Sequence, residues 1–351
     1  MKKHCILILV SYEYESLQLT FKGLDHTADP SVPIIIVLNG ASFSYKGSKV
    51  EQHCRAWASL AENRYVIRPM ACGKAPIYAI QEVINLSPIL KDIDYVLKID
   101  DDVIPLKKGW DVDLANCFFE HEKLHGKIGF VTGLINNNCW GFKELLSIYE
   151  KWDEYARFMN HPSTAGVFKD RIVKIGEVDT GQNGTIHAFP TLAAWLHKWT
   201  SFDIDSFVEK TRSGKVKEVE LDIHYSIGCM YSHKSLWTDL QVTKATDFDE
   251  LIIHRYCLAN KLRKFAVMSQ PMLHLYYNNQ RLINAYLLPQ FIKHLSAYFK
   301  DESIKDLEFA TVQDQAYELE DQLKTLKDLD RRFTYLEKNV NRVKKIFKPF
   351  A

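Results

Sequence analysis

Short apolar runs alternate with amphipathic stretches through the first hundred residues of this 351-residue chain. Cys5–Val10 and Ile34–Leu38 are unbroken apolar runs, as expected for strands buried on both faces of a parallel sheet. Tyr65–Arg68 and Tyr95–Ile99 are two further β-rich runs. Helical patterns separate the four runs, at 15–24, 52–61 and 76–86. This order predicts an α/β fold whose ligands bind beyond the carboxyl ends of the strands, with helices on both faces of a mainly parallel, Rossmann-like sheet.

The pattern is less regular after residue 105. A helix is expected to begin near Asp249, and the chain from Arg281 onward is expected to be largely helical. Residues 160–220 contain several glycines and few periodic positions, so loops or an insertion near the site are expected there. Three further strands are expected, at 129–134, 221–231 and 266–274. We therefore expect one domain over 1–280, with a nucleotide-binding half at about 1–105 and an acceptor half at 106–280, followed by a helical extension over 281–351.

The C-terminal tail has a pattern of its own. Residues 301–330 contain three basic and ten acidic side chains, whereas 331–351 contain seven basic and one acidic. Its apolar side chains recur at spacings of three and four: Leu326, Leu329, Phe333, Leu336, Val340, Val343 and Phe347. Such a seam is typical of a coiled coil or of helix packing. The pattern is compatible with three alternative roles for the tail: self-association, contact of its basic end with an anionic membrane surface, and packing against its own domain.

Composition and charge exclude several classes of protein. The chain has 45 Lys and Arg against 44 Asp and Glu, a formal charge of +1, which argues against a nucleic-acid binder. A hydrophobic content of 46% is enough for a real core, so global disorder is excluded. No apolar run approaches the roughly 18 residues of a membrane span, and the first run is too short for a signal peptide. Seven scattered cysteines without a CxxC pair favour the reducing cytosol. We expect a cytoplasmic protein, either free or peripheral on the inner face of the cell membrane.

Three consecutive carboxylates, Asp100 to Asp102, directly follow the fourth apolar run. Adjacent carboxylates repel one another, and a bound cation relieves that repulsion. Mg²⁺ and Mn²⁺ prefer oxygen ligands and are commonly shared between one or two carboxylates and substrate phosphates. A solvated acidic loop or a helix cap is the alternative. The buried strand before the carboxylates favours a site for a divalent cation.

Five short motifs occur in an order that is found in one family of enzymes. Val10–Tyr12 follows the first strand, Val37–Gly40 ends the second, Gly73–Ala75 opens a helix, Lys98–Asp102 is a DxD element, and Asp249–Glu250 is an acidic pair. Together they resemble the GT-A glycosyltransferases, most of all the family-2 group that contains many bacterial polysaccharide enzymes. The resemblance covers roughly residues 3–280.

The resemblance implies transfer of a sugar from a nucleotide diphosphate sugar, with a UDP-sugar as the leading donor. The acceptor would be a hydroxyl of a glycan or glycolipid in bacterial surface polysaccharide biosynthesis, and the single displacement would invert the anomeric centre. A Mn²⁺ or Mg²⁺ ion would bridge the phosphates. The implied donor-binding residues are Ser11, Tyr12, Glu13, Asn39, Lys74, Asp100 and Asp101, and the implied metal ligands are Asp102, Asp100 and His274.

Two of these assignments have alternatives. The register favours Glu250 as the catalytic base, with Asp249 as the alternative, because the pair reads Asp-Glu where Glu-Asp is usual. Acidic side chains at this position are also favoured by the dipole at a helix N-terminus. His274 ends a predicted strand, where it is either a metal ligand or a structural histidine.

Asn138 and Trp140 are candidates for binding the acceptor. An exposed aromatic ring stacks well on a sugar, and asparagine side chains hydrogen-bond to hydroxyl groups. A packed turn explains the same residues equally well.

Two other functions compete with glycosyl transfer. A non-catalytic assembly protein with a degenerate transferase domain would share the fold. A sugar nucleotidylyltransferase would need a glycine-rich loop after the first strand, and residues 11–14 contain no glycine.

Overall fold

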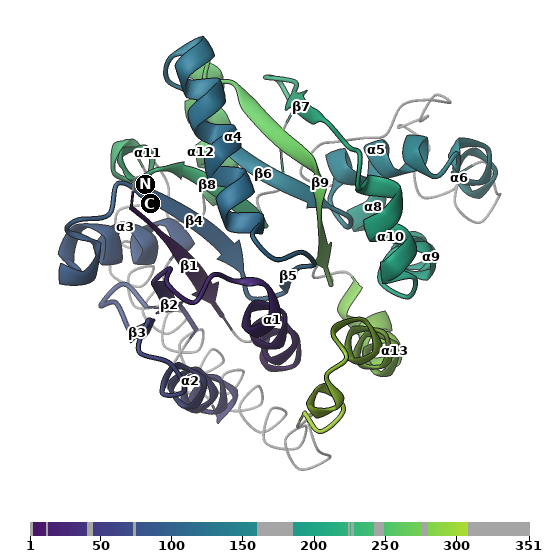
Figure 1. The fold of residues 1–351 in the computed structure, drawn as a ribbon, viewed down its shortest axis with the longest axis horizontal. Helices are drawn as coiled ribbons and strands as arrows, with labels where there is room; N and C mark the ends of the chain where they lie inside the picture. The colour runs from purple at the N-terminus through teal and green to yellow at the C-terminus, as the bar shows by residue number, and fades with distance from the viewer. Residues whose placement is uncertain are drawn as a thin grey trace, which may run out of the picture.

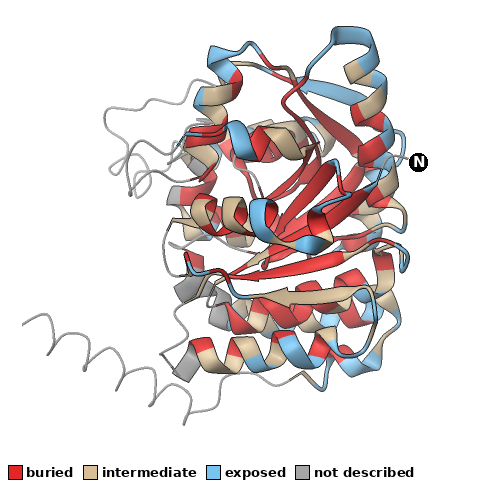
Figure 2. Cartoon of the chain, turned by 90° about the vertical axis from the view of Figure 1, so that its left-hand side faces the viewer, coloured by how far each residue is buried: buried red, intermediate tan, exposed pale blue. Residues whose placement is uncertain are grey.

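A computed structural model of the chain describes residues 3–11, 13–40, 45–72, 75–159, 185–223, 225, 228–241, 249–275 and 280–307. The predicted seam in the tail, at 326–347, lies outside the described residues, as do Tyr12 and Lys74. Figure 1 shows a central sheet with helices on both faces, and Figure 2 shows that its strands form the buried middle of the molecule.

The first four strands form a parallel block in the order β3-β2-β1-β4. They are β1 (His4–Val10), β2 (Ile34–Leu38), β3 (Arg64–Ile67) and β4 (Tyr95–Asp100). Val10 pairs with Leu38 and Leu9 pairs with Asp100, so the carboxyl ends of these strands lie side by side. The residues after β1, β2 and β4 therefore meet at one edge of the sheet.

Helices connect these strands, as the sequence predicts. They are α1 (Tyr14–Thr27), α2 (Tyr45–Ala58) and α3 (Pro76–Leu86), with a short 3₁₀ turn, η1 (Pro88–Leu90), before β4. α3 begins with Pro76, whose fixed φ suits the first turn of a helix. The side chains of Ile6, Leu7 and Ile8 are fully buried, which is why β1 reads as an unbroken apolar run.

The second half of the chain adds strands of mixed direction to the same sheet. They are β5 (Val103–Pro105), β6 (Phe130–Ile135), β7 (Val216–Val219), β8 (Cys229–His233) and β9 (Lys264–His274). Within the described residues the sheet has nine strands, in the order β3-β2-β1-β4-β8-β6-β9-β5, with β7 also paired to β9. β8 is antiparallel to β4, and β6 is parallel to β9. The expected mixed, mainly parallel α/β sheet flanked by helices is confirmed.

The pairing of β9 with β6 contains an irregularity, and the other edge of β9 pairs with a different strand on either side of it. Gly133 of β6 pairs with Val267 of β9, but the next residue, Leu134, pairs with Pro271. β7 pairs with β9 before this bulge, and β5 pairs with it afterwards, so that Val103 lies opposite His274. β5, which follows the Asp100–Asp102 turn directly, thus places these carboxylates next to the carboxyl end of β9.

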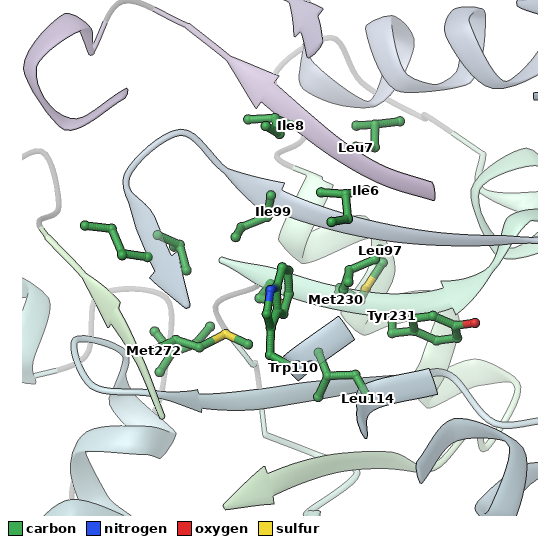
Figure 3. Close-up of a cluster of buried hydrophobic side chains, with 14 of the residues drawn as sticks. Ile6, Leu7, Ile8, Leu97, Ile99, Trp110, Leu114, Met230, Tyr231 and Met272 are labelled. Atoms are coloured by element: carbon green, nitrogen blue, oxygen red, sulfur yellow. The ribbon is translucent and has the colours of Figure 1, made fainter. Parts of the chain in front are cut away.

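The remaining helices all come from the second part of the chain. They are α4 (Trp110–His125), α5 (Cys139–Ile148), α6 (Trp152–Met159), α8 (Thr185–Ala188), α9 (Pro190–Trp199), α10 (Ile204–Thr211), α11 (Lys234–Asp239), α12 (Asp249–Ala259), α13 (Arg281–Phe299) and a 3₁₀ turn, η3 (Glu302–Ile304). In Figure 3, Trp110 and Leu114 of α4 lie beside buried side chains of β4 and β8. None of the described helices is both long and apolar enough to cross a bilayer.

The structure differs from the sequence analysis in two places. Within the range expected to be loops or an insertion, the described residues form helices at 185–188, 190–199 and 204–211, and the helix that Pro190 opens buries Leu192 and Leu196 on one side. Of the strand expected over 221–231, the described residues contain the start of β8 at Cys229, whereas 221–223 and 225 are not in a strand.

Candidate active site

Asp102 and His274 meet at the carboxyl ends of β4 and β9. His274 Nε2 is 3.1 Å from Asp102 Oδ2, although the two residues are 172 apart in the sequence. The Nδ1–H group of His274 donates to the carbonyl of Asn137 at 3.0 Å, which directs Nε2 toward the carboxylate. Burial alone would lower the pKa of His274, but the Asp102 carboxylate outweighs it and raises the pKa to about 9. Two of the three expected metal ligands are therefore in contact.

A buried network of amides holds His274 in this position. Asn136 Oδ1 accepts a hydrogen bond from the backbone N–H of His274 at 2.8 Å, and Asn136 Nδ2 donates to Thr200 Oγ1 at 3.0 Å. Asn137 Nδ2 donates to Gln280 Oε1 at 2.7 Å. The asparagines and Gln280 are at most 1% exposed. The run of asparagines is visible in the sequence, but its role in orienting an imidazole depends on pairing that the sequence does not display.

A buried lysine links Asp100 to Asp249. Lys98 Nζ is 2.5 Å from Asp100 Oδ1 and 3.8 Å from Asp249 Oδ2. Burial and the carboxylates of Asp102 and Asp249 raise the pKa of Asp100 to about 6, although Lys98 opposes this shift. Burial would lower the pKa of Lys98, but the adjacent carboxylates outweigh it and raise the pKa, so the ammonium group stays charged. Asp249, the first residue of α12, thus belongs to the same cluster as the DxD element, and the half-buried Glu250 follows it.

The carboxylate of Asp101 is used inside the protein. Its Oδ2 atom accepts a hydrogen bond from the backbone N–H of Ser11 at 2.8 Å, and its carbonyl accepts one from Thr20 Oγ1 at 3.0 Å. The side chain is enclosed, and burial together with the Asp102 charge raises the pKa of Asp101 well above its usual range. Asp101 therefore anchors the loop after β1 in this structure.

The expected donor-binding residues of β1 and β2 lie at neighbouring strand ends. The backbone N–H of Asn39 donates to the carbonyl of Val10 at 2.8 Å, and Ser11 and Asn39 are half-buried. Glu13 is only 8% exposed and precedes the first turn of α1. The Sγ–H group of Cys72 donates to the carbonyl of Gly40 at 2.8 Å, which fixes the turn after β2.

The two expected acceptor-binding residues are buried. Trp140 is 2% exposed and its Nε1–H donates to Glu220 Oε2 at 3.0 Å. Asn138 is 1% exposed and caps α5, where its Oδ1 accepts a hydrogen bond from the N–H of Gly141 at 2.7 Å. The exposed sugar-binding surface expected here is not formed by these side chains, because both serve to pack and cap α5.

No protein-family model and no curated protein sequence matches the chain. Solved structures that are similar to it include TarS of S. aureus, with 11% sequence identity over 84% of this chain and a TM-score of 0.39. GalNAc-T7 with UDP, GalNAc and Mn²⁺ is similar at 10% identity over 79% of this chain, with a TM-score of 0.43. The mannosyltransferase PcManGT from Pyrobaculum calidifontis, in complex with GDP-Man and Mn²⁺, is similar at 9% identity over 86% of this chain, with a TM-score of 0.42. The chain spans 42%, 44% and 65% of the lengths of these three proteins, respectively.

The side chains of Asp102, Asp100 and His274 suit a divalent cation that also binds a phosphate group of a substrate. Among the described residues, no group of three or more His, Cys, Asp or Glu side chains is arranged to hold a metal ion. Asp102 and His274 are in contact, whereas Asp100 is paired with Lys98. One or two protein carboxylates with phosphate oxygens and waters is a common environment for Mg²⁺, and the hydrogen bond from His274 Nδ1 to a carbonyl is typical of a metal-binding imidazole. These residues therefore fit a divalent ion bound together with a diphosphate.

Proposed function

We propose that this protein is a divalent-cation-dependent glycosyltransferase, which moves a sugar from a nucleotide diphosphate sugar to a hydroxyl of a glycan or glycolipid. The observation that carries the proposal is the Asp102–His274 contact beside the Lys98 cluster, at the carboxyl ends of β4 and β9. Ligands of α/β sheets bind at such strand ends, and the paired carboxylate and imidazole suit a cation bound with a diphosphate.

The donor would lie across the ends of β1 and β2. Ser11, Glu13 and Asn39 are the residues there that would contact the nucleoside, together with Tyr12 and Lys74, which lie outside the described residues. A UDP-sugar is the first donor to test. Asp101 supports this surface indirectly, because its carboxylate holds the backbone of Ser11.

Asp102 and His274, joined by Asp100, would hold Mn²⁺ or Mg²⁺. When bound, this cation would offset the negative charge that develops on the leaving diphosphate. The amide network of Asn136 and Asn137 keeps the imidazole of His274 aimed at the carboxylate of Asp102.

Glu250 would act as the general base. It would take the proton of the acceptor hydroxyl as that oxygen bonds to the anomeric carbon and the bond from this carbon to the diphosphate breaks. Such a displacement inverts the anomeric centre. Glu250 is half-buried at the start of α12, whereas Asp249 is 8% exposed and faces Lys98, which suits it to a positioning role. Asp249 is the alternative base.

The first test is release of nucleotide diphosphate from a panel of nucleotide sugars with and without Mn²⁺, alongside thermal shift. We expect a donor that stabilises the protein only with Mn²⁺, and Asp102→Asn should lower kcat by about 100-fold or more. Asp239→Asn is the matched control, because Asp239 is a surface residue 3.5 Å from Lys127. If no donor is bound or turned over and Asp102→Asn behaves as the wild type, the assembly-protein alternative replaces this proposal.

The base is identified by comparing two isosteric variants. Glu250→Gln should reduce kcat by about 10²- to 10⁴-fold while donor affinity is kept. Asp249→Asn should act mainly through the geometry of the Lys98 cluster and retain more activity. The reverse ranking would assign the proton transfer to Asp249.

The cellular setting stays a prediction from the sequence. It comprises a role in bacterial surface polysaccharide biosynthesis, a cytoplasmic location, and contact with a membrane surface or a second copy through the tail. Deleting residues 326–351 and measuring mass in solution and liposome binding distinguishes these roles of the tail.

A further inference from the structure

Lys98 is a fully buried lysine at the centre of the proposed site. It precedes Asp100 by two residues on β4, so the two side chains project from the same face of the sheet. Leu97 and Ile99 alternate with them and belong to the core cluster that Figure 3 draws beside Trp110. The Lys98 side chain is 2% exposed, and its ammonium group contacts both Asp100 and Asp249.

These contacts join two parts of the fold. Asp100 ends β4, and Asp249 begins α12, which also carries Glu250. One ammonium group therefore ties the turn with the DxD element to the helix with both candidate bases. A buried charge is tolerated only where opposite charges surround it, and here the two carboxylates supply that environment.

A divalent cation bound at this site would compete with Lys98 for the carboxylate of Asp100. Asp100 and Asp102 are two residues apart on the chain, so their like charges repel one another. A cation held by Asp102 and His274 would attract Asp100 and repel the ammonium group. Asp249 offers Lys98 a second carboxylate when Asp100 turns to the cation.

We infer that Lys98 is a positioning residue that serves as the internal counter-ion of the site. Without a bound cation it neutralises Asp100 and keeps the start of α12 beside the DxD turn. When the cation takes Asp100, Asp249 retains the ammonium group. Lys98 thereby sets the affinity for the cation and couples its binding to the helix that carries the base. This inference rests on the proposed function.

Two substitutions should change cation affinity in opposite directions. Lys98→Met removes the competing charge, so Mn²⁺ should bind about tenfold more tightly or better, while kcat falls because α12 loses its tie to β4. Asp249→Asn removes one of the two carboxylates that contact Lys98, so the ammonium group should stay on Asp100 and Mn²⁺ should bind about tenfold more weakly. Lys98→Arg keeps the charge and should stay close to the wild type in Mn²⁺ affinity.

Lys264 provides the matched control. It is a second buried lysine, 1% exposed, but its ammonium group donates to backbone carbonyls of Leu221 and Ile223 at 3.2 and 2.7 Å. Lys264→Met removes an equally buried amine that forms no ion pair with a carboxylate among the described residues. It should lower the melting temperature and leave the Mn²⁺ affinity unchanged.

The measurement is a Mn²⁺ titration of the full chain, alone and in the presence of UDP, followed by electron paramagnetic resonance or calorimetry, with circular dichroism to verify folding. Tighter binding by Lys98→Met and weaker binding by Asp249→Asn support the inference. Unchanged or weaker binding by a folded Lys98→Met variant overturns it, and if that variant does not fold, unchanged binding by Asp249→Asn overturns it. A wild-type chain that binds no Mn²⁺ contradicts the proposed cation dependence itself, whereas wild-type binding with unaltered variants contradicts only the role of Lys98.

Discussion

His197 illustrates how single buried side chains determine the behaviour of this protein. It is fully buried, its Nδ1 atom is 2.7 Å from Ser201 Oγ, and its ring meets that of Phe291 edge-on. Burial, assisted by the charge of His274, lowers the pKa of His197 to about 3. The imidazole is therefore neutral in the folded protein at every physiological pH.

This shift predicts a loss of stability in acid. The unfolded chain binds a proton at His197 near the ordinary histidine pKa of about 6.5, and the folded chain does so only near 3. The contribution of His197 to stability is therefore complete above pH 6.5 and is lost as the pH falls toward 3, at up to about 1.4 kcal/mol per pH unit. Denaturant unfolding of the wild type and of His197→Gln at pH 7, 6, 5 and 4 gives the difference between their free energies of unfolding, which should change with pH. A constant difference between the two proteins over this range would contradict the prediction.

At the scale of elements, the packing of α5 against the end of β6 leaves no room for a side chain at Gly141. A Cβ atom there would lie 1.8 Å from the carbonyl oxygen of Ile135. The same turn holds the cap of α5, because Gly141 N–H donates to Asn138. The amide network around His274 begins in this turn, so α5 and the candidate metal ligand depend on one close backbone contact.

Gly141→Ala should therefore destabilise the protein by about 3 kcal/mol, since backbone must move to relieve the overlap. Gly109→Ala is the control, because its Cβ would meet nothing within 4 Å and only its left-handed backbone, with a φ of 76°, opposes alanine. That substitution should lower the free energy of unfolding by about 1 kcal/mol. Equal unfolding free energies for the two variants, from denaturant titration, would show that the contact at Gly141 relaxes without cost.

The elements that could be predicted from the sequence are those with strong local patterns. β2 and α3 have the predicted bounds because an unbroken apolar run and an initial proline define them locally. β5 and β7 were not predicted, because each is only three or four residues long and exists through pairing with β9. The resemblance to the GT-A family implies Asp102 and His274 as ligands of one metal, whereas the Lys98 bridge and the burial of Trp140 depend on packing between distant segments.

Across the whole molecule, α13 and η3 fold back onto α1. His26 of α1 stacks on Phe299 with ring centroids 4.7 Å apart, and its Nε2 atom is 3.0 Å from Asp301 Oδ2. Asp301 also accepts hydrogen bonds from the N–H and hydroxyl groups of Ser303. These bonds, with His26, lower the pKa of Asp301 to about 2. One carboxylate thus secures a late helix to the first helix of the chain.

Asp301→Asn should loosen α13 without unfolding the sheet. We expect the free energy that holds α13 against α1 to fall by about 1–2 kcal/mol, because charge-assisted hydrogen bonds are replaced by neutral ones. Hydrogen exchange should accelerate in 281–299 and stay unchanged in β1 and β4. Glu302→Gln, at a side chain 81% exposed, is the control. Since the Asp301 pKa is lowered from 3.8, its contribution should persist above about pH 4 and disappear as the pH falls toward 2. Uniform acceleration across the sheet would refute local detachment.

The separation of Asp102 from His274 also governs when the site can form during synthesis. At roughly 5–20 residues per second, a ribosome needs about 10–30 seconds to pass from the carboxylate to the imidazole. The strands β1 to β4 are complete at the start of this interval, and β9 is complete only at its end. A nascent chain therefore carries the acidic turn for many seconds before it carries the histidine. A translation product that stops within this interval has Asp102 without His274. The Asp102–His274 contact can therefore form only in a chain whose synthesis has passed the end of β9.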